Sequence, residues 1–319
     1  SRFHMGVNLM TEFIMLVGLP ASGKSTYAEK LKEKEYHIHS SDSIREELTG
    51  DANTQDKNID VFATLHKRVK DDLNNGISCV YDATNMSMKR RKVFLDEIKK
   101  YNCRKKCVLF VIPVEVCKER NSNRERRVPD EVFDKMLKSF WVPMKYEGWD
   151  DVKIVLDEEY DYEGEYVKLL QNSTYFAQDN KHHRYSLMKH MTESAHYCIN
   201  HFKNISADRF TRICIALYNH DIGKLITKTF INSKGERTDE AHYYGHDHAG
   251  SYLFLCGFSE NLLDDVDGTL YIASLINWHM RPYLGWKESE KARERDRKLI
   301  GEEMYQDIMI LNECDRAAH

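Results

Sequence analysis

The chain has 319 residues, of which 41% are hydrophobic, and it carries a formal net charge of -4. This length predicts about two domains, and the hydrophobic content is sufficient for each domain to bury its own core. The slight acidity argues against a protein that binds nucleic acid through its whole surface, so we expect any such contact to be local. The basic runs at 89–92 and 118–127 are the places where it would occur.

Membrane and disulfide classes are also disfavoured. The apolar runs are too short to span a bilayer, and we find no signal-peptide pattern at the start of the sequence. The eight cysteines have no disulfide-framework spacing. We therefore expect a soluble, cytoplasmic protein with reduced thiols and no membrane partner.

Short β-type runs alternate with helical patterns in the first half of the chain. The β-type runs lie at 13–17, 36–39, 77–81, 107–112 and 152–155, and helical patterns lie between them, for example at 59–73 and 91–99. This alternation predicts an α/β domain with a parallel sheet and flanking helices. The acidic stretch 157–165 ends the pattern, and from residue 180 onward one helical pattern follows another. We expect the α/β domain at 12–165 and an all-α domain at 175–319.

A glycine-rich phosphate-binding pattern, GxxxxGK[ST], follows the first predicted strand and precedes a helical run at 27–34. In such a loop the backbone N–H groups surround the phosphates, the lysine reaches the outer phosphates and the hydroxyl can bind Mg²⁺. The sequence therefore predicts a site for a nucleoside triphosphate with Mg²⁺. The candidate residues are Gly18, Ser22, Gly23, Lys24, Ser25 and Thr26.

Polar side chains also follow the second and third predicted strands. Asp42 comes at the carboxyl end of a strand, where open α/β sheets bind ligands, and it is placed to accept a hydroxyl proton as a base. Arg45, one helical turn later, fits a second phosphate on the acceptor. The pair Ser41-Asp42 also fits an ordinary helix N-cap. Asp82 would orient the Mg²⁺ water or the acceptor, or else form a simple turn.

Four arginines lie at 120–127, just before a helix that Pro129 can start. Arginines carried by a lid can stabilise the negative charge on a phosphoryl group during its transfer. Arg120 and Arg124 are spaced to share one helix face, so we expect these two to take that role.

Together, these motifs resemble the end-healing 5′-polynucleotide kinases of phages and bacteria, over roughly residues 12–160. The resemblance implies ATP and Mg²⁺ as cofactors and RNA or DNA ends as substrates. It makes Asp42 the general base for the 5′-hydroxyl, Arg45 the ligand of the acceptor's 3′ phosphate, and Arg120 and Arg124 the clamp on the donor. Small-molecule and aminoacyl-tRNA kinases share the same P-loop core, and the match at Arg45 favours a nucleic-acid end.

Histidine is concentrated in the second half, which holds 11 of the 15 in the chain. The pair His220-Asp221 follows an amphipathic run at 210–217, and consecutive helical residues point about 100° apart, so a shared ion needs ligands from other helices. Imidazole and carboxylate ligands suit divalent transition ions such as Mn²⁺, Fe²⁺, Co²⁺, Ni²⁺ or Zn²⁺. Such an ion acidifies bound water for phosphoester cleavage. The further candidate ligands are His190, His246, His279 and Asp315.

This H…HD…H…H…D series resembles the HD phosphohydrolase superfamily over about residues 175–319. The stretches GHDHAG and INWHMRP are similar to the HD domains attached to tRNA nucleotidyltransferases. The resemblance assigns Lys224 to the scissile phosphate, and His183 and His196 remain alternatives to the first histidine. It places metal ligands at His190, His220, Asp221 and Asp315, with His246 and His279 available for a second ion.

A 5′-kinase and a phosphoesterase for 2′,3′-cyclic or terminal 2′/3′ phosphates carry out the two operations that a cleaved RNA needs before ligation. We therefore expect a bifunctional nucleic-acid end-healing enzyme, which a separate ligase would complement. Two alternatives stay open. In one, the HD half hydrolyses free nucleotides. In the other, the P-loop half is an ATP-dependent switch and the HD half senses nucleotides without turnover.

Overall fold

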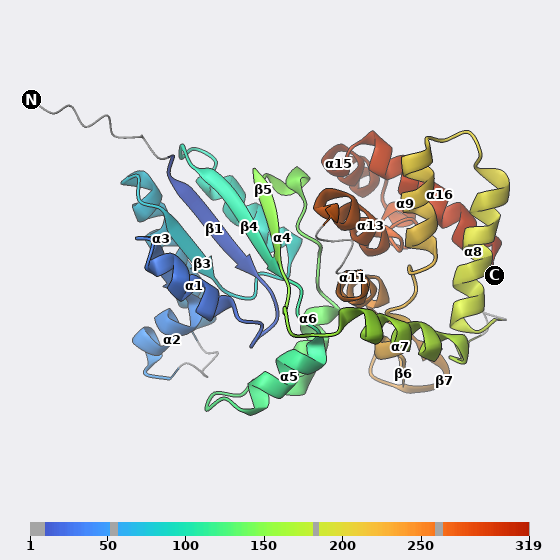
Figure 1. Ribbon diagram of the computed structural model, residues 1–319, viewed down its shortest axis with the longest axis horizontal. Coiled ribbons are helices and arrows are strands. Elements are labelled where there is room, and N and C mark those ends of the chain that lie inside the picture. Colours follow the sequence, from blue (N-terminus) through green and yellow to red (C-terminus); the bar gives the residue numbers. More distant parts are fainter. Residues whose placement is uncertain (1–9, 52–56, 181–184, 259–263, 319) are drawn as a thin grey trace, which may run out of the picture.

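The computed structural model describes residues 10–51, 57–180, 185–258 and 264–318, arranged as an α/β half beside a helical half (Figure 1). His183, an alternative metal ligand, lies outside these residues. Within the described ranges, no helix is both long enough and apolar enough to cross a bilayer.

Five parallel strands form the sheet of the first half, in the order β2-β3-β1-β4-β5. The central strand is β1, in which five of the six residues are buried because helices cover both faces of the sheet. This confirms the predicted parallel sheet. The strands are β1 (Glu12–Val17), β2 (His37–Ser40), β3 (Cys79–Asp82), β4 (Arg104–Phe110) and β5 (Asp151–Val155).

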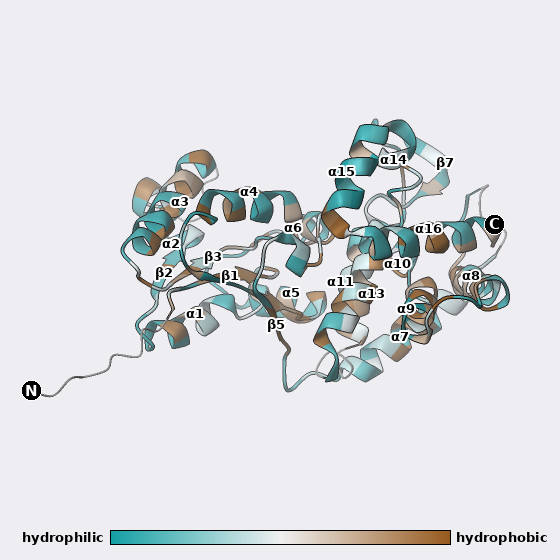
Figure 2. Cartoon of the chain, turned by 90° about the horizontal axis from the view of Figure 1, so that it is seen from above, coloured by the Kyte–Doolittle hydropathy of each residue, from teal (hydrophilic) through white to brown (hydrophobic). Residues whose placement is uncertain are grey.

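Helices flank this sheet, with α3 and α4 on one face and α1 on the other (Figure 2). In α3 an apolar residue recurs every four positions from Val61 to Leu73, and this stripe is buried against the sheet. The helices of this half are α1 (Lys24–Lys32), α2 (Ser41–Thr49), α3 (Asn58–Asn74), α4 (Met88–Ile98), α5 (Val114–Ser122), α6 (Asp130–Leu137) and the 3-10 turn η1 (Lys145–Glu147).

The second half packs its helices around α11 and α13, in which most residues are buried on every side. Helices that are apolar all round belong in an interior. The helices are α7 (Tyr162–Thr174), α8 (Leu187–His201), α9 (Ala207–Leu217), α10 (Lys224–Thr227), α11 (His246–Gly257), α13 (Val266–Trp278), α14 (Gly285–Glu288), α15 (Glu290–Ile300) and α16 (Glu302–Ala317).

The sequence predicted an all-α second half, and this prediction is wrong. The strands β6 (Thr229–Ile231) and β7 (Arg237–His242) pair there as an antiparallel hairpin. The turn explains the difference. The side-chain oxygen of Asn232 accepts hydrogen bonds from the backbone N–H groups of Lys234 and Glu236, and Gly235 adopts φ +83°. This hairpin leads into the loop before α11, which begins with His246.

The two halves share one continuous hydrophobic core and several buried hydrogen bonds. The side chain of Asn277 accepts from the Val142 N–H at 2.7 Å and donates to the Phe140 carbonyl at 3.1 Å. The Tyr252 hydroxyl donates to the Ile112 carbonyl at 2.6 Å. Helix α7, which lies where the domain boundary was expected, packs against α8, α10 and α11.

Candidate active sites: a phosphate cleft and a histidine cluster

The phosphate-binding loop turns tightly at the carboxyl end of β1, and its geometry requires glycine at two positions. A Cβ added to Gly18 would lie 2.8 Å from the Ser22 hydroxyl and 2.9 Å from the Phe110 Cβ. Gly23 adopts φ +94°, a left-handed conformation that other residues rarely adopt. The glycines of the motif therefore fix the shape of the loop just before α1 begins.

Lys24 is buried beneath this loop. Its ammonium donates to the backbone carbonyls of Gly18 at 3.0 Å and Leu19 at 2.6 Å. Burial lowers the pKa of Lys24 to about 8, and the nearby carboxylate of Asp82 opposes this shift. A cation held mainly by neutral carbonyls is well suited to take up the charge of a phosphate group.

Ser25 and Asp82 face each other across the loop and β3. The Ser25 hydroxyl donates to Asp82 Oδ2 at 3.2 Å. Burial raises the pKa of Asp82, and the Lys24 charge and the Ser25 hydrogen bond oppose that rise. A P-loop hydroxyl beside a carboxylate is the oxygen-ligand arrangement that holds Mg²⁺ in P-loop enzymes, so the residues fit this ion. Thr26 is exposed on the first turn of α1.

A cleft of about 850 Å³ extends from the loop towards the predicted acceptor residues. This volume is typical of small-ligand sites. Because donor and acceptor candidates line one space, phosphoryl transfer between two bound substrates is geometrically reasonable. Its lining includes Ser22, Gly23, Lys24, Ser25, Asp42, Arg45, Asp82 and Arg124.

On the acceptor side, an exposed carboxylate lies above a buried guanidinium. The Asp42 side chain is 61% exposed, and its Oδ1 lies 3.0 Å from Arg45 Nη1 and 2.8 Å from Arg126 Nη1. The Arg45 side chain is 7% exposed and donates to Asn58 Oδ1 at 2.8 Å. Its Nε is buried and has no acceptor among the described residues. Arg45 therefore keeps a donor available, while Asp42 stays accessible to a substrate hydroxyl.

In the second half, all six predicted metal ligands are buried and meet in one place. They come from α8, the turn after α9, the start of α11, the end of α13 and α16. His196, the alternative to His190, is exposed on α8 and is not a member of either set. In each set of three, the candidate ligand atoms lie within 4.8 Å of one another. The sets are His190, His220 and Asp315, and Asp221, His246 and His279.

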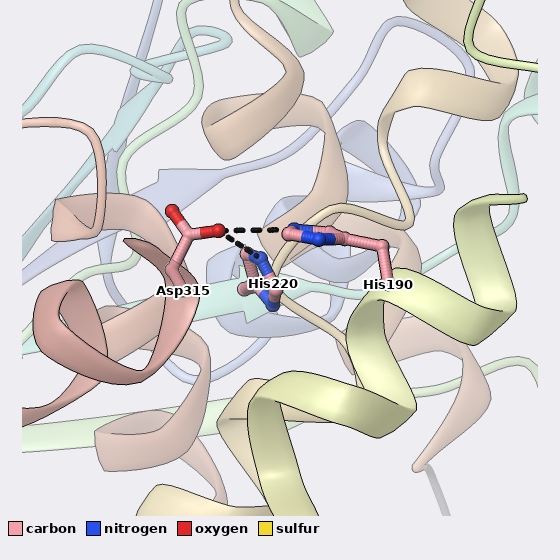
Figure 3. A group of neighbouring side chains, drawn as sticks. All are labelled: His190, His220 and Asp315. Carbon is pink, nitrogen blue, oxygen red and sulfur yellow. Dashed lines mark ion pairs between the residues drawn. The ribbon is translucent and has the colours of Figure 1, made fainter. Parts of the chain in front are cut away.

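The carboxylate of Asp221, a member of one set, also lies close to the other set. Asp315 Oδ1 lies 2.9 Å from His190 Nε2 and 3.4 Å from His220 Nε2 (Figure 3). Asp221 Oδ1 lies 3.1 Å from His246 Nε2, and its Oδ2 lies 3.4 Å from His190 Nε2. Asp221 thus stands between both sets, with one oxygen on each side.

Backbone contacts orient the imidazoles. In His220, His246 and His279, Nδ1 lies 2.7–2.8 Å from the carbonyl oxygen three residues earlier in the chain. Donation from Nδ1 leaves the Nε2 lone pair directed at the carboxylates, the tautomer that binds metals. The Nε2 of His220 is buried and has no hydrogen bond among the described residues. This mixed nitrogen and oxygen donor set fits a divalent transition ion.

A cavity of about 680 Å³ opens from this cluster. Within it, Lys224 Nζ lies 2.6 Å from Asp221 Oδ2 and donates to Gln178 Oε1 at 2.9 Å. Burial by itself would raise the pKa of Asp221, but the charge of Lys224 and contacts with the histidines hold it well below its usual value. The Tyr283 hydroxyl donates to Asp315 Oδ2 at 2.8 Å. The rim carries the exposed side chains Tyr244, Leu284 and Arg316.

Residues 13–143 match the family described as AAA domain (AAA_33). The first half of the chain is a P-loop kinase-like domain. L-seryl-tRNA(Sec) kinase of Methanococcus maripaludis is 26% identical over 53% of this chain and 69% of its own length. The bifunctional polynucleotide phosphatase/kinase of Schizosaccharomyces pombe is 25% identical over 48% of this chain and 35% of its own length. Protein kti12 of the same organism is 26% identical over 43% of this chain and 54% of its own length.

The chain thus spans about a third to a half of the two yeast relatives and about two thirds of the archaeal one. Among solved structures, a putative kinase from Chloroflexus aurantiacus matches 48% of this chain and 92% of its own, with 16% identity and a TM-score of 0.40. A chain of the Pnkp1/Rnl/Hen1 complex matches 38% of this chain and 42% of its own, with 23% identity and a TM-score of 0.32.

In the P-loop kinase-like domain, the expected pairing of two lid arginines on one helix face is wrong. Helix α5 ends before Arg124, because the Asn121 side chain bonds to both the N–H and the carbonyl of Val128 and so turns the chain. Arg124 lines the cleft, whereas Arg120 forms a 2.5 Å ion pair with Asp157 and is not among the lining residues.

Several residues of the two sites were not predicted from the sequence. Arg126 contacts Asp42, and its only sequence signal was membership of the arginine run. In the other basic run, Arg90 lines the cleft, whereas Arg91 is fully buried and forms a bidentate ion pair with Glu147 at 2.7 and 2.8 Å. Gln178 and Tyr283 at the histidine cluster had no recognisable sequence signal.

Proposed function

We propose that this chain is a bifunctional enzyme that heals nucleic-acid ends. Its first half would transfer the γ-phosphate of ATP to the 5′-hydroxyl of an RNA or DNA end. Its second half would hydrolyse 2′,3′-cyclic or terminal 2′/3′ phosphates. The main support is the single cleft in which Asp42 and Arg45 lie opposite the phosphate loop.

Each polar group of the cleft has a chemical role in this proposal. The exposed carboxylate of Asp42 accepts the hydroxyl proton, while the neighbouring guanidinium of Arg45 binds a phosphate of the acceptor. Lys24 binds the outer phosphates of the donor, and Arg124 and Arg126 lie where negative charge develops during transfer. Ser25 and Asp82 would hold Mg²⁺, which supplies charge neutralisation at the phosphates.

The names of the relatives agree with an acceptor carried by nucleic acid. One relative is a kinase of seryl-tRNA and another is a polynucleotide phosphatase/kinase. Both matches cover about half of this chain, and the HD half would add the second activity independently.

For the second half, we propose that His190, His220, Asp221 and Asp315 hold one divalent transition ion and that Asp221, His246 and His279 hold another. Such ions supply acidified water for hydrolysis. Lys224, anchored on Asp221 at 2.6 Å and lining the cavity, would bind the scissile phosphate. Tyr283 holds Asp315 in place through its hydroxyl.

In a second candidate function, the first half is still a kinase, and the HD half hydrolyses or senses free nucleotides. The size of its cavity, about 680 Å³, favours this candidate, because a mononucleotide fits a site of that volume.

The test offers one RNA with a 5′-hydroxyl and a 2′,3′-cyclic phosphate, together with ATP and a panel of divalent metals, and follows both ends. We expect both ends to react. Lys24→Ala should abolish only 5′ phosphorylation, and Asp221→Ala should abolish only opening of the cyclic phosphate. If Asp42→Ala phosphorylates the 5′ end as fast as the wild type, Asp42 is not the general base. If the second half hydrolyses only free nucleotides, the second candidate function is favoured.

A further inference from the structure

A second, strongly basic cavity lies directly beside the cavity of the histidine cluster. It has a volume of about 490 Å³, and Arg316 lines both cavities. The turn at 282–284 separates them, with Pro282 on one side and Leu284 on the other. Because Arg316 lines both spaces, the two cavities adjoin, and a ligand at the cluster can extend into this one. We call it the basic subsite, and it is lined by Pro282, Trp286, Lys287, Arg293, Met309, Asn312 and Arg316.

Charge in the basic subsite has one sign only. Three cationic side chains line it and no carboxylate does, among the described residues. The Nε of Arg293 donates to the Tyr305 hydroxyl at 2.6 Å, and its Nη1 lies 3.6 Å from Glu290 Oε2, outside the lining. Lys287 is exposed on α14. In a chain with a net charge of -4, such a lining favours an anionic ligand.

A buried amide gives an independent indication of a ligand. Asn312 is 8% exposed, and its Nδ2 has no hydrogen-bond acceptor among the described residues. Buried donors without an acceptor are uncommon in folded proteins, so this amide requires a partner from outside the chain, such as a water molecule, an ion or a ligand. An anionic oxygen in the subsite would accept from Asn312 and neutralise the neighbouring cations.

We propose that the basic subsite binds a backbone phosphate of a polynucleotide whose 3′ end lies at the histidine cluster. This inference rests on the proposed function and narrows its substrate from any terminal phosphate to the end of a chain. In a polynucleotide, a second phosphate always accompanies the reacting one, whereas a simple mononucleotide has none. At the rim, Tyr244 is exposed and offers an aromatic face on which the terminal base can stack.

The test compares Lys287→Glu with the control Lys291→Glu, an exposed lysine on α15 that does not line the subsite. The substrates are a 2′,3′-cyclic mononucleotide, the same nucleotide with a 5′ phosphate, and an oligonucleotide with a 2′,3′-cyclic end. We expect Lys287→Glu to lower kcat/KM about tenfold for the oligonucleotide, through KM, and to change the simple mononucleotide less than twofold. The slope of log affinity against log salt should fall by about 0.7 for one lost phosphate contact.

Several outcomes would overturn the inference. One is that Lys287→Glu lowers kcat/KM equally for the simple mononucleotide and the oligonucleotide. Another is that Lys291→Glu lowers kcat/KM for the oligonucleotide as much as Lys287→Glu does. A third is that Lys287→Glu leaves kcat/KM for the oligonucleotide unchanged. If Lys287→Glu lowers kcat/KM as much for the 5′-phosphorylated mononucleotide as for the oligonucleotide, the subsite binds free nucleotides and the polynucleotide assignment is wrong.

A failure of the proposed function would be recognised separately. If the wild type hydrolyses none of the substrates with any metal, the proposed function fails. The subsite is then tested by fluorescence anisotropy with a 5′-phosphorylated oligonucleotide, whose binding Lys287→Glu should weaken and Lys291→Glu should not. Equal binding by all three proteins would disprove the subsite. Thermal unfolding of each variant checks that a loss of binding is not a loss of fold.

Discussion

The phosphate cleft and the histidine cluster hold their charged groups in opposite ways. In the cleft, the Lys24 ammonium rests on backbone carbonyls, and the Asp42 carboxylate is mostly exposed. In the cluster, the charged groups are buried and face one another, so that Asp221 lies close to histidines and to Lys224. The backbone therefore shapes the first site, while mutual charge compensation shapes the second.

This difference predicts that removing a charged side chain lowers the free energy of unfolding by different amounts at the two sites. Removing the exposed Asp42 carboxylate still leaves Arg45 with its hydrogen bond to Asn58. Removing a member of the cluster leaves neighbouring charges without compensation in the interior. Substitutions at the two sites test this contrast.

Asp221→Ala should destabilise the metal-free protein by about 3–5 kcal/mol, because it leaves the buried Lys224 ammonium without its carboxylate. The matched control is Asp42→Ala, at an exposed carboxylate, which should lower stability by about 1 kcal/mol or less, because Arg45 loses one partner but keeps its hydrogen bond to Asn58. Urea denaturation of both variants in the presence of a chelator measures the contrast. Similar free energies of unfolding for the two variants would contradict it.

The same contrast explains what could be predicted from the sequence. The phosphate loop is a contiguous motif, and Asp82 was predicted beside it because the carboxyl ends of parallel strands meet at one edge of the sheet. The candidate ligands of the cluster were predicted from the resemblance to the HD pattern. Their division into two sets around Asp221 depends on how α8, α11, α13 and α16 pack, which no local pattern encodes.

The parts that were missed depend on local turns and tertiary contacts. Arg126 contacts Asp42 and Arg120 does not line the cleft, because the Asn121 side chain ends α5 and redirects the arginine run. The β6–β7 hairpin depends on a four-residue turn at Asn232, in a segment whose strands are short. Helical periodicity alone predicts neither feature, because both arise from a single side chain bonding to the backbone.

A smaller effect separates the two arginines of the P-loop kinase-like domain. Arg126→Ala should slow 5′ phosphorylation about tenfold, since it removes a donor next to Asp42 in the cleft. Arg120→Ala should change the rate less than about twofold, because its partner is Asp157 and it does not line the cleft. Single-turnover transfer from labelled ATP measures both rates. A larger loss in Arg120→Ala would mean that the arginine segment moves when substrates bind.

The smallest expected effect is a pH dependence that belongs to the cleft. Burial lowers the pKa of Lys24 from 10.5 to about 8, so the unfolded chain binds more protons than the folded one between these values. Without nucleotide, this lysine makes the free energy of unfolding rise as the pH increases from about 8 to 10.5. A bound triphosphate favours the ammonium and raises the pKa again.

Binding of nucleotide near pH 9 should therefore take up a large fraction of one proton, on the order of 0.5 to 1. Calorimetric titration in two buffers of different ionisation enthalpy measures this uptake, and Lys24→Met, which has no ammonium, should show none. This proton uptake distinguishes the cleft from the cluster, because the buried lysine of the cluster, Lys224, is already paired with the Asp221 carboxylate before any ligand binds. Equal proton uptake by the wild type and Lys24→Met would show that Lys24 is already fully charged in the free cleft.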